Sequence, residues 1–178
     1  VTQMLLEHKA NVNQAKENGD SALHCASKNR HKDIVRMLLQ HKANVNQATT
    51  DDCISPLWIA SLREYKEIVQ MLLQHKANVN QVATDDCLSP LYISSNLGNK
   101  DVVQMLLDAG ADPHLRTYLL GNTVLYSLRE LPLPKTEIIE MIEQADPPEE
   151  RRLRFLRRLR VSRARKCWRS WVRVLLRQ

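Results

Sequence analysis

The chain has 178 residues, of which 43% are hydrophobic and only 4% aromatic, so it can form one domain with an appendage but lacks a large aromatic core. Its four cysteines are Cys25, Cys53, Cys87 and Cys167, and their wide spacing fits neither a CxxC zinc clip nor a dense disulfide framework. This favours an intracellular location, cytoplasmic or nuclear. The sequence has no run of 18 apolar residues for a membrane span and no basic segment before an apolar start for a signal peptide.

The formal charge of +6 conceals two regions of opposite sign. Twelve of the 26 basic residues and none of the 20 acidic residues lie in residues 151–178, so this tail carries +12. The first 150 residues therefore carry −6. Such a division predicts that the two regions have separate roles.

The first region is built from an internal repeat. The chain opens with VTQMLLEHKANVNQ, the second half of a unit, and three complete units follow with a period of 33 to 34 residues. These units are repeat 1 (15–47), repeat 2 (48–81) and repeat 3 (82–115), and a degenerate repeat 4 occupies 116–145. Because the chain begins inside a unit, we expect it to be part of a longer protein.

Each unit reads as two short helices. In repeat 2, Ser55 is placed to cap a helix and Pro56 to occupy its first turn, which predicts a helix over residues 56–63. The apolar residues Ile68 to Leu73 then form the wide face of a second helix that is buried between neighbours. A helix pair this short must be stabilised by stacking on adjacent pairs, so the sequence predicts an all-α solenoid.

Several short sequence segments resemble the consensus of a known repeat family. SALHCA (21–26), SPLWIA (55–60) and SPLYIS (89–94) resemble the ankyrin signature T-P-L-H-x-A, and LLDAGADPH (106–114) resembles the ankyrin ending L-L-x-x-G-A-D-V-N. The resemblance covers about residues 1–145. It implies antiparallel helix pairs with β-turn fingers between them, and a scaffold or adaptor that binds a protein partner on the fingers and on the concave face of the first helices.

Some residues depart from the family pattern. Lys9, Lys42 and Lys76 stand where the family has a left-handed glycine, as Gly110 does in repeat 3, and we expect each lysine to cost about 1 kcal/mol in strain. The family histidine is present as His24 but is replaced by Trp58, Tyr92 and Tyr126 in the later repeats. Leu128 replaces a small alanine, so we expect repeat 4 to be distorted.

The fingers before Ser55 and Ser89 each contain one extra residue, and both read TDDC. Their aspartates are interpreted first as turn formers, then as an acidic rim that meets a basic partner. A metal site of Asp and Cys is the weakest alternative, because no histidine at ligand spacing completes it. With the variable positions of the first helices, where Lys28 and Asn29 also fall, the predicted partner-binding residues are Asp51, Asp52, Ile54, Leu62, Arg63, Asp85, Asp86, Leu88, Asn96 and Leu97.

The sequence offers little for catalysis. His8, His41 and His75 recur at the repeat period in EHKA or QHKA, which is typical of turn residues rather than of a general base. No GxGxxG, P-loop, GxSxG or HExxH string occurs, and the chain has four glycines. We therefore expect no enzyme activity, no cofactor and no metal.

The tail follows a proline-containing linker at 146–150. Val161, Ala164, Trp168, Trp171 and Leu175 share one face of a helical wheel, and arginines lie on the others, so 151–178 predicts a basic amphipathic helix. Three surfaces compete for it: the end of the repeat stack, an anionic membrane, and a calmodulin-like protein. Nucleic acid is a weaker alternative and disorder remains open. The predicted tail contacts are Arg163, Arg165, Trp168 and Trp171.

Overall fold

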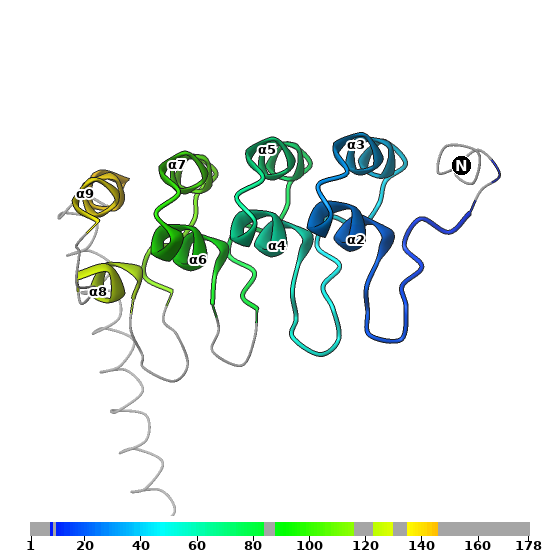
Figure 1. The fold of residues 1–178 in the computed structure, drawn as a ribbon, viewed down its shortest axis with the longest axis horizontal. Coiled ribbons are helices and arrows are strands. Elements are labelled where there is room, and N and C mark those ends of the chain that lie inside the picture. Colours follow the sequence, from blue (N-terminus) through cyan, green and yellow to red (C-terminus); the bar gives the residue numbers. More distant parts are fainter. Residues whose placement is uncertain (1–7, 9, 84–87, 116–122, 130–134, 146–178) are drawn as a thin grey trace, which may run out of the picture. The chain divides into compact units, whose positions relative to one another are not determined.

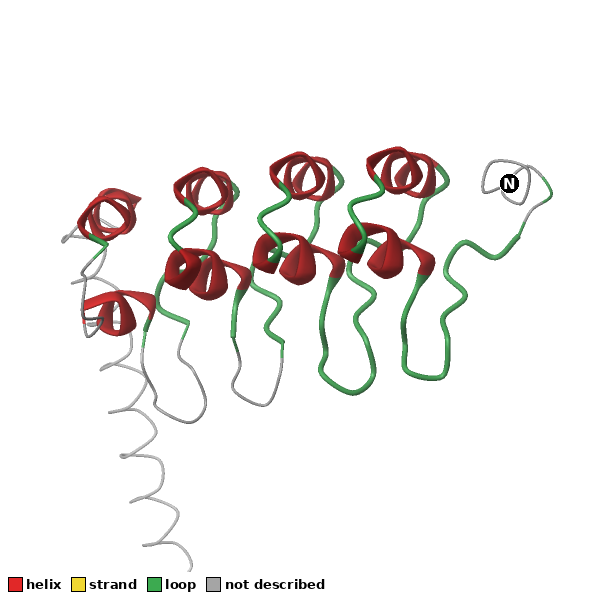
Figure 2. Cartoon of the chain, in the orientation of Figure 1, coloured by secondary structure: helices red, strands yellow, loops and turns green. Residues whose placement is uncertain are grey.

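The computed structural model describes residue 8 and residues 10–83, 88–115, 123–129 and 135–145. The helices lie in two rows (Figures 1 and 2). The first row contains α2 (Ala22–Lys28), α4 (Pro56–Leu62), α6 (Pro90–Leu97) and α8 (Val124–Arg129). The second row contains α3 (Lys32–Gln40), α5 (Lys66–Gln74), α7 (Lys100–Asp108) and α9 (Thr136–Ala145). The described residues form no strand, and isolated β-bridges close two of the fingers.

The first helices begin at serine caps, as predicted for Ser55. The side chains of Ser21, Ser55 and Ser89 each accept a hydrogen bond from the backbone N–H three residues later. Pro56 and Pro90 follow in the first turn, where the missing N–H removes no helical bond. The helix that begins at Pro56 ends at Leu62, one residue earlier than predicted, with the next residue as its C-cap.

In repeats 1 to 3, both helices of each pair pack against a neighbouring repeat, and the second helices each contribute a buried leucine. Leu38, Leu72 and Leu106 occupy equivalent positions in α3, α5 and α7, and all three are fully or almost fully buried. They belong to one continuous hydrophobic core that extends through all four helix pairs. Each helix is therefore stabilised by its neighbours rather than by its own length.

Asparagine side chains fix the register between repeats. The backbone N–H of Asn44 donates to Asn13 Oδ1 at 2.6 Å, and that of Asn78 donates to Asn46 Oδ1 at 2.7 Å. A third bond of 2.8 Å joins the Asp112 N–H to Asn80 Oδ1 in the same way. Because every bond joins one repeat to the next, a slip of one residue would leave these turn N–H groups without partners.

Lysines occupy left-handed positions, as the sequence predicts. Lys42 has φ 61° and Lys76 has φ 63°, and Gly110 has φ 84° at the equivalent place. Lys9 lies outside the described residues. Sequence reasoning missed a second set: Arg30 and Glu64 end the first helices of repeats 1 and 2 at φ 60° and 59°. Alignment with Gly98 of repeat 3, at φ 85°, would have revealed them.

Repeat 4 contributes two helices to the same core. Leu128, which replaces the usual small residue, and Val124 are both fully buried in α8, and Ile138 and Ile142 are buried in α9. The chain divides into two compact parts, Val1–Ile142 and Glu143–Gln178. Only residues 143–145 of the second part are described, so the predicted tail helix lies outside the described residues. None of the described helices is long and apolar enough to cross a membrane.

Candidate protein-binding surface

The fingers differ in length where the sequence predicts it. In repeat 1 the Lys16 N–H donates to Asp20 O at 3.1 Å, and three residues lie between them. In repeat 2 the Thr49 N–H donates to Ile54 O at 3.1 Å across four residues. Repeat 3 also spans four residues between Ala83 and Leu88, which are joined by two backbone bonds of 3.0 Å. The extra residue therefore lies in the turn of each finger.

Neighbouring fingers lie close together. The Thr50 N–H of the second finger donates to Asn18 O of the first at 3.1 Å. Beside this bond, a Cβ atom added to Gly19 would lie 2.5 Å from Thr50 N, and the residue has φ 78°. Only glycine satisfies both the backbone angle and the close approach. The turns of the first two fingers are therefore held against each other.

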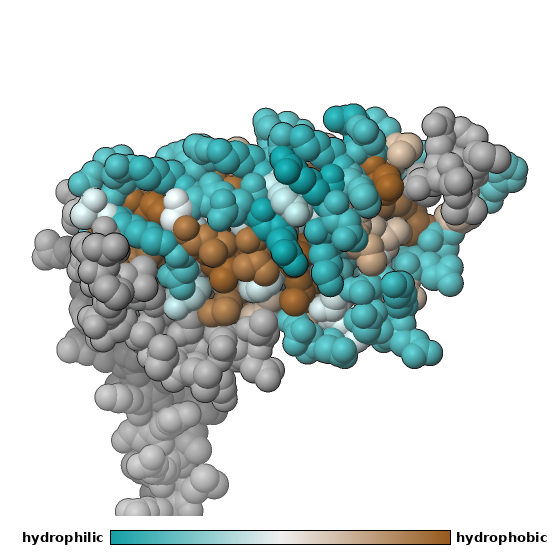
Figure 3. Space-filling model, in the orientation of Figure 1, coloured by the Kyte–Doolittle hydropathy of each residue, from teal (hydrophilic) through white to brown (hydrophobic). Residues whose placement is uncertain are grey.

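A second hydrophobic cluster lies between α4, α6 and the bases of their fingers, separate from the main core. Trp58, Ile59 and Ala83 are its buried members, and four half-buried residues pack against them. We call this group the inner apolar cluster; it consists of Ile54, Trp58, Ile59, Leu62, Ala83, Leu88 and Ile93. In the space-filling view, hydrophobic residues gather over α4 and α6 (Figure 3).

An exposed leucine follows the cluster along α6. Leu97 is 44% exposed and is the one large hydrophobic side chain that is exposed among the described residues. It lies four residues after Ile93, hence one helical turn further along α6. Leu62 lies three residues after Ile59 in α4 and is half-buried. Two first helices therefore carry apolar side chains that the fold itself covers only partly.

Trp58 joins α4 to the finger of repeat 3. It is 6% exposed, and its indole Nε1 donates a hydrogen bond of 2.9 Å to the backbone oxygen of Leu88 in the next finger. Tryptophan here replaces the family histidine. Because its ring is larger, it adds apolar area to the cluster and still satisfies its N–H.

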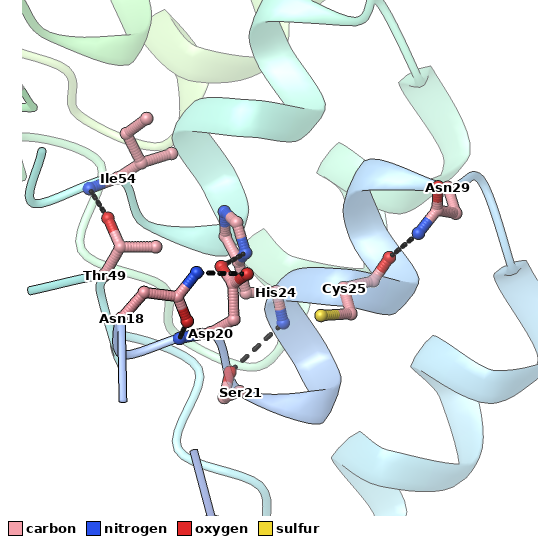
Figure 4. A network of polar contacts seen from close by, with 8 residues as sticks. All are labelled: Asn18, Asp20, Ser21, His24, Cys25, Asn29, Thr49 and Ile54. Carbon is pink, nitrogen blue, oxygen red and sulfur yellow. Dashed lines mark hydrogen bonds and ion pairs between the residues drawn. The ribbon is translucent and has the colours of Figure 1, made fainter. Parts of the chain in front are cut away.

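Repeat 1 has a polar network at the same place (Figure 4). Asp20 Oδ1 lies 2.8 Å from Nδ1 of His24, and Asp20 Oδ2 accepts from Asn18 Nδ2 at 2.9 Å. His24 is 3% exposed. Burial lowers the pKa of His24 below its usual 6.5, since desolvation penalises the imidazolium, and Asp20 opposes this effect. The imidazole is therefore held in its neutral form at pH 7.

The structure places the predicted contact residues in different surroundings. Ile54, Leu62 and Leu88 are brought together in the inner apolar cluster, with Leu97 one turn beyond Ile93. Arg63 at the end of α4 is exposed.

The predicted polar contact residues differ in their exposure to solvent. Asp51 and Asp52 are exposed on the second finger, and Asn96 is half-buried. Asp85 and Asp86 lie outside the described residues, as do the four tail contacts, Arg163, Arg165, Trp168 and Trp171. An acidic rim over both fingers therefore stays a prediction.

Four members of the cluster, Trp58, Ile59, Ala83 and Ile93, were not predicted. Trp58, Ile59 and Ile93 lie in the phrases SPLWIA and SPLYIS, which sequence reasoning used only to identify the repeats. Comparison with SALHCA would have shown that repeats 2 and 3 carry an aliphatic residue where repeat 1 has Cys25. This difference between the repeats was the feature of the sequence that could have identified the cluster.

Two hollows of the described surface lie away from this cluster. One of about 320 Å³ is lined by Gly98, Lys100 and the start of α9, and one of about 330 Å³ is lined by residues 30–34. Lys100 is paired with Glu137 there, and Lys32 with Glu67 at 2.5 Å. Both of these lysines therefore already have partners.

Comparison with known proteins identifies the repeats. The family model described as ankyrin repeats (3 copies) matches residues 1–49 and 46–117. No match was found among curated proteins. Ankyrin repeats are generally protein–protein interaction modules and are typically not catalytic. With its paired helices, its fingers and this match, the chain belongs to the ankyrin-repeat family.

Proposed function

We propose that this chain is a scaffold or adaptor that binds a protein partner through the inner apolar cluster and Leu97. The carrying observation is the 44% exposure of Leu97, which lies one turn beyond half-buried Ile93 on α6. The neighbouring helix α4 carries Leu62, which is also half-buried. A single exposed apolar residue is common on monomers, whereas an exposed one that extends a partly covered apolar cluster is typical of a protein-binding surface.

The proposed partner presents apolar side chains to this cluster and basic groups to Asp51 and Asp52. Both aspartates are exposed on the finger whose base contains Ile54. Apolar burial would supply most of the affinity, because it removes the surface of Leu97 and its neighbours from water. The aspartates would mainly increase the association rate, since steering by charge acts on encounter.

The surface can be tested by site-specific photo-crosslinking. A crosslinking residue at position 97 should capture a partner, whereas the same residue at Gln104, which is exposed in the second helix row, should not. The captured protein is then purified for affinity measurements. Leu97→Glu should weaken binding at least about tenfold, and Gln70→Glu, an equal charge change at an exposed position of α5, should not.

Two outcomes would contradict the proposal. Capture from position 104 alone would place the partner on the second helices. Undiminished affinity of both Leu97→Glu and Leu62→Glu would show that the inner apolar cluster is not the contact.

The contribution of the finger is tested by charge removal. Asp51→Asn with Asp52→Asn keeps side chains that can form turn hydrogen bonds but removes two negative charges. We expect slower association and a weaker dependence of the association rate on salt, with little change in dissociation. Unchanged association at low salt would leave these residues as turn formers.

A second role is proposed for the tail on its sequence alone. Residues 151–178 carry +12 and a face with Trp168 and Trp171, which suits an anionic membrane or a calmodulin-like groove. A peptide of this segment should gain helix, and its tryptophan emission should shift, on anionic vesicles or on calmodulin. Replacing both tryptophans by alanine should reduce the affinity. If it does not, and only removal of arginines does, the attraction is purely electrostatic.

A further inference from the structure

Repeat 1 carries three metal-ligating residue types at positions where repeats 2 and 3 are mostly apolar. Counted from the capping serine of each first helix, Asp20, His24 and Cys25 correspond to Ile54, Trp58 and Ile59. In repeat 3 the same positions hold Leu88, Tyr92 and Ile93. The three residues thus occupy the place that the inner apolar cluster occupies in the neighbouring repeats.

The three side chains lie close together in the structure. One ligand atom of each, a carboxylate oxygen, a ring nitrogen and Cys25 Sγ, lies within 4.8 Å of the other two. Asp20 and His24 lie side by side near the start of α2, with Cys25 next along the helix (Figure 4). The Asp20 Oδ1 to His24 Nδ1 distance is 2.8 Å. Cys25 is a free, half-buried cysteine.

Neighbouring residues determine the environments of Asp20 and His24. Asn18 holds the Asp20 carboxylate by donating from Nδ2 at 2.9 Å, and it accepts from the Asp20 N–H at 3.1 Å. Neither ring nitrogen of the buried His24 makes a hydrogen bond of accepted geometry among the described residues, although Nδ1 lies 2.8 Å from Asp20 Oδ1. A buried nitrogen without a hydrogen bond carries a desolvation penalty, and an ion bound at Nδ1 offsets it for that nitrogen.

We propose that Asp20, His24 and Cys25 form a site for a divalent zinc-type ion, with water in the fourth position. Thiolate, imidazole and carboxylate together favour Zn²⁺ over Mg²⁺ or Ca²⁺, which prefer oxygen ligands. Ligand atoms around tetrahedral zinc lie roughly 3.3 to 3.7 Å apart, given metal–ligand lengths of about 2.0 to 2.3 Å. The Asp20–His24 pair must open slightly, and the Cys25 side chain must rotate toward it. On binding, the thiol releases its proton to solvent.

The metal-binding candidates in the sequence were the TDDC fingers, which have no histidine at ligand spacing. The group of Asp20, His24 and Cys25 was not predicted, because Asp20 precedes the capping serine and His24 was assigned to the repeat signature. The proposal is independent of the protein-binding surface, since it concerns repeat 1 and not the apolar cluster.

The experiment uses the full chain, reduced and freed of metal, titrated with Co²⁺ and then with Zn²⁺. We expect one equivalent of Co²⁺ to give a thiolate-to-metal charge-transfer band, which Zn²⁺ displaces. Cys25→Ser should remove the band and weaken Zn²⁺ binding at least about tenfold. Cys53→Ser, a change at an exposed cysteine of the second finger, should leave both unchanged.

Asp20→Asn is the second variant, and it should weaken Zn²⁺ binding while circular dichroism confirms the fold. The wild-type midpoint of thermal unfolding should rise with Zn²⁺, because an ion that binds the folded chain stabilises it. A charge-transfer band that survives Cys25→Ser would overturn the proposal. The absence of any band in the wild-type chain would do so as well.

Discussion

In repeat 1 the positions beside the finger hold Asp20, His24 and Cys25, whereas in repeat 2 they hold Ile54, Trp58 and Ile59. The second helices of the same two repeats are nearly identical, since IVRMLLQHKANVNQ and IVQMLLQHKANVNQ differ at one residue in fourteen.

Burial explains the contrast. Second helices are packed against a neighbouring repeat, and their apolar residues belong to the continuous core. A change there would disturb close packing in two repeats at once. The finger side of a first helix lies outside that continuous core, and three of its positions, Asp20, Cys25 and Ile54, are only half-buried, so its residues can differ without loss of the stack. The shared helix therefore maintains the fold, and the side that differs is available for binding.

The largest expected effect tests the shared helix. Leu72→Ala removes a fully buried side chain from α5 and should lower the free energy of unfolding by roughly 2 to 5 kcal/mol. Leu38→Ala, at the equivalent position of α3, should fall in the same range, and Leu73→Ala, at a half-buried position, should lose less. Chemical denaturation measures all three. Equal losses at positions 72 and 73 would contradict the division between buried and partly covered faces.

The second-largest expected effect tests the finger side of the first helix, where repeats 1 and 2 differ in sequence. Trp58→Phe keeps an aromatic ring in the inner apolar cluster but removes the hydrogen bond to Leu88 O. That oxygen still accepts from the Ala83 N–H, so it is not left unpaired. We expect a loss of about 1 kcal/mol in unfolding free energy. A loss as large as that of Leu72→Ala would show that this side also holds the stack together.

A third prediction concerns Lys42 of repeat 1 and Lys76 of repeat 2, which occupy equivalent left-handed turn positions. Lys76→Gly relieves strain of about 1 kcal/mol but increases the conformational entropy of the unfolded chain, which costs about 0.4 to 1 kcal/mol of stability. We expect a net gain of up to about 0.6 kcal/mol, and the same for Lys42→Gly. Gln70→Gly, inside α5, should instead lose about 1 kcal/mol. If Lys76→Gly destabilises the chain, the lysine is not strained.

The pH dependence should distinguish repeat 1 from repeat 2. Burial lowers the pKa of His24 in the folded chain, so the unfolded chain takes up a proton first as the pH falls. Stability from this residue is complete above about 6.5 and is lost as the pH falls from there through the folded pKa. The loss should be modest because Asp20 opposes the burial. Denaturation of the wild type and of His24→Gln between pH 7.5 and 5.5 should give a flatter profile for the variant.

The smallest effect is expected at the ion pairs between second helices. Lys66 pairs with Asp101 in the next repeat, and both side chains are about half exposed. Lys66→Ala should lower the unfolding free energy by less than about 1 kcal/mol, with a smaller loss at high salt. A larger loss that persists in salt would mean that the lysine stem contributes through packing.

The sequence by itself determined the local structure. The period of 33 to 34 residues, the serine caps, and the lysines aligned with Gly110 predicted the helix pairs and the left-handed turns, because these features depend on residues close along the chain. Only the tertiary structure decided the surfaces. Trp58 meets Leu88 across thirty residues, and Gly19 is required by a contact with Thr50 of the next finger.

The difference has a physical cause. Caps and turns are satisfied within a few residues, so their chemistry is visible in a short phrase. Burial at Ile54 or exposure at Leu97 depends on how closely neighbouring repeats stack, and no single repeat contains that information. The proximity of Asp20, His24 and Cys25 is local instead, because the three residues lie within six positions at the start of α2 and their spacing is visible in the sequence. Only the burial of His24 depends on the stacked repeats.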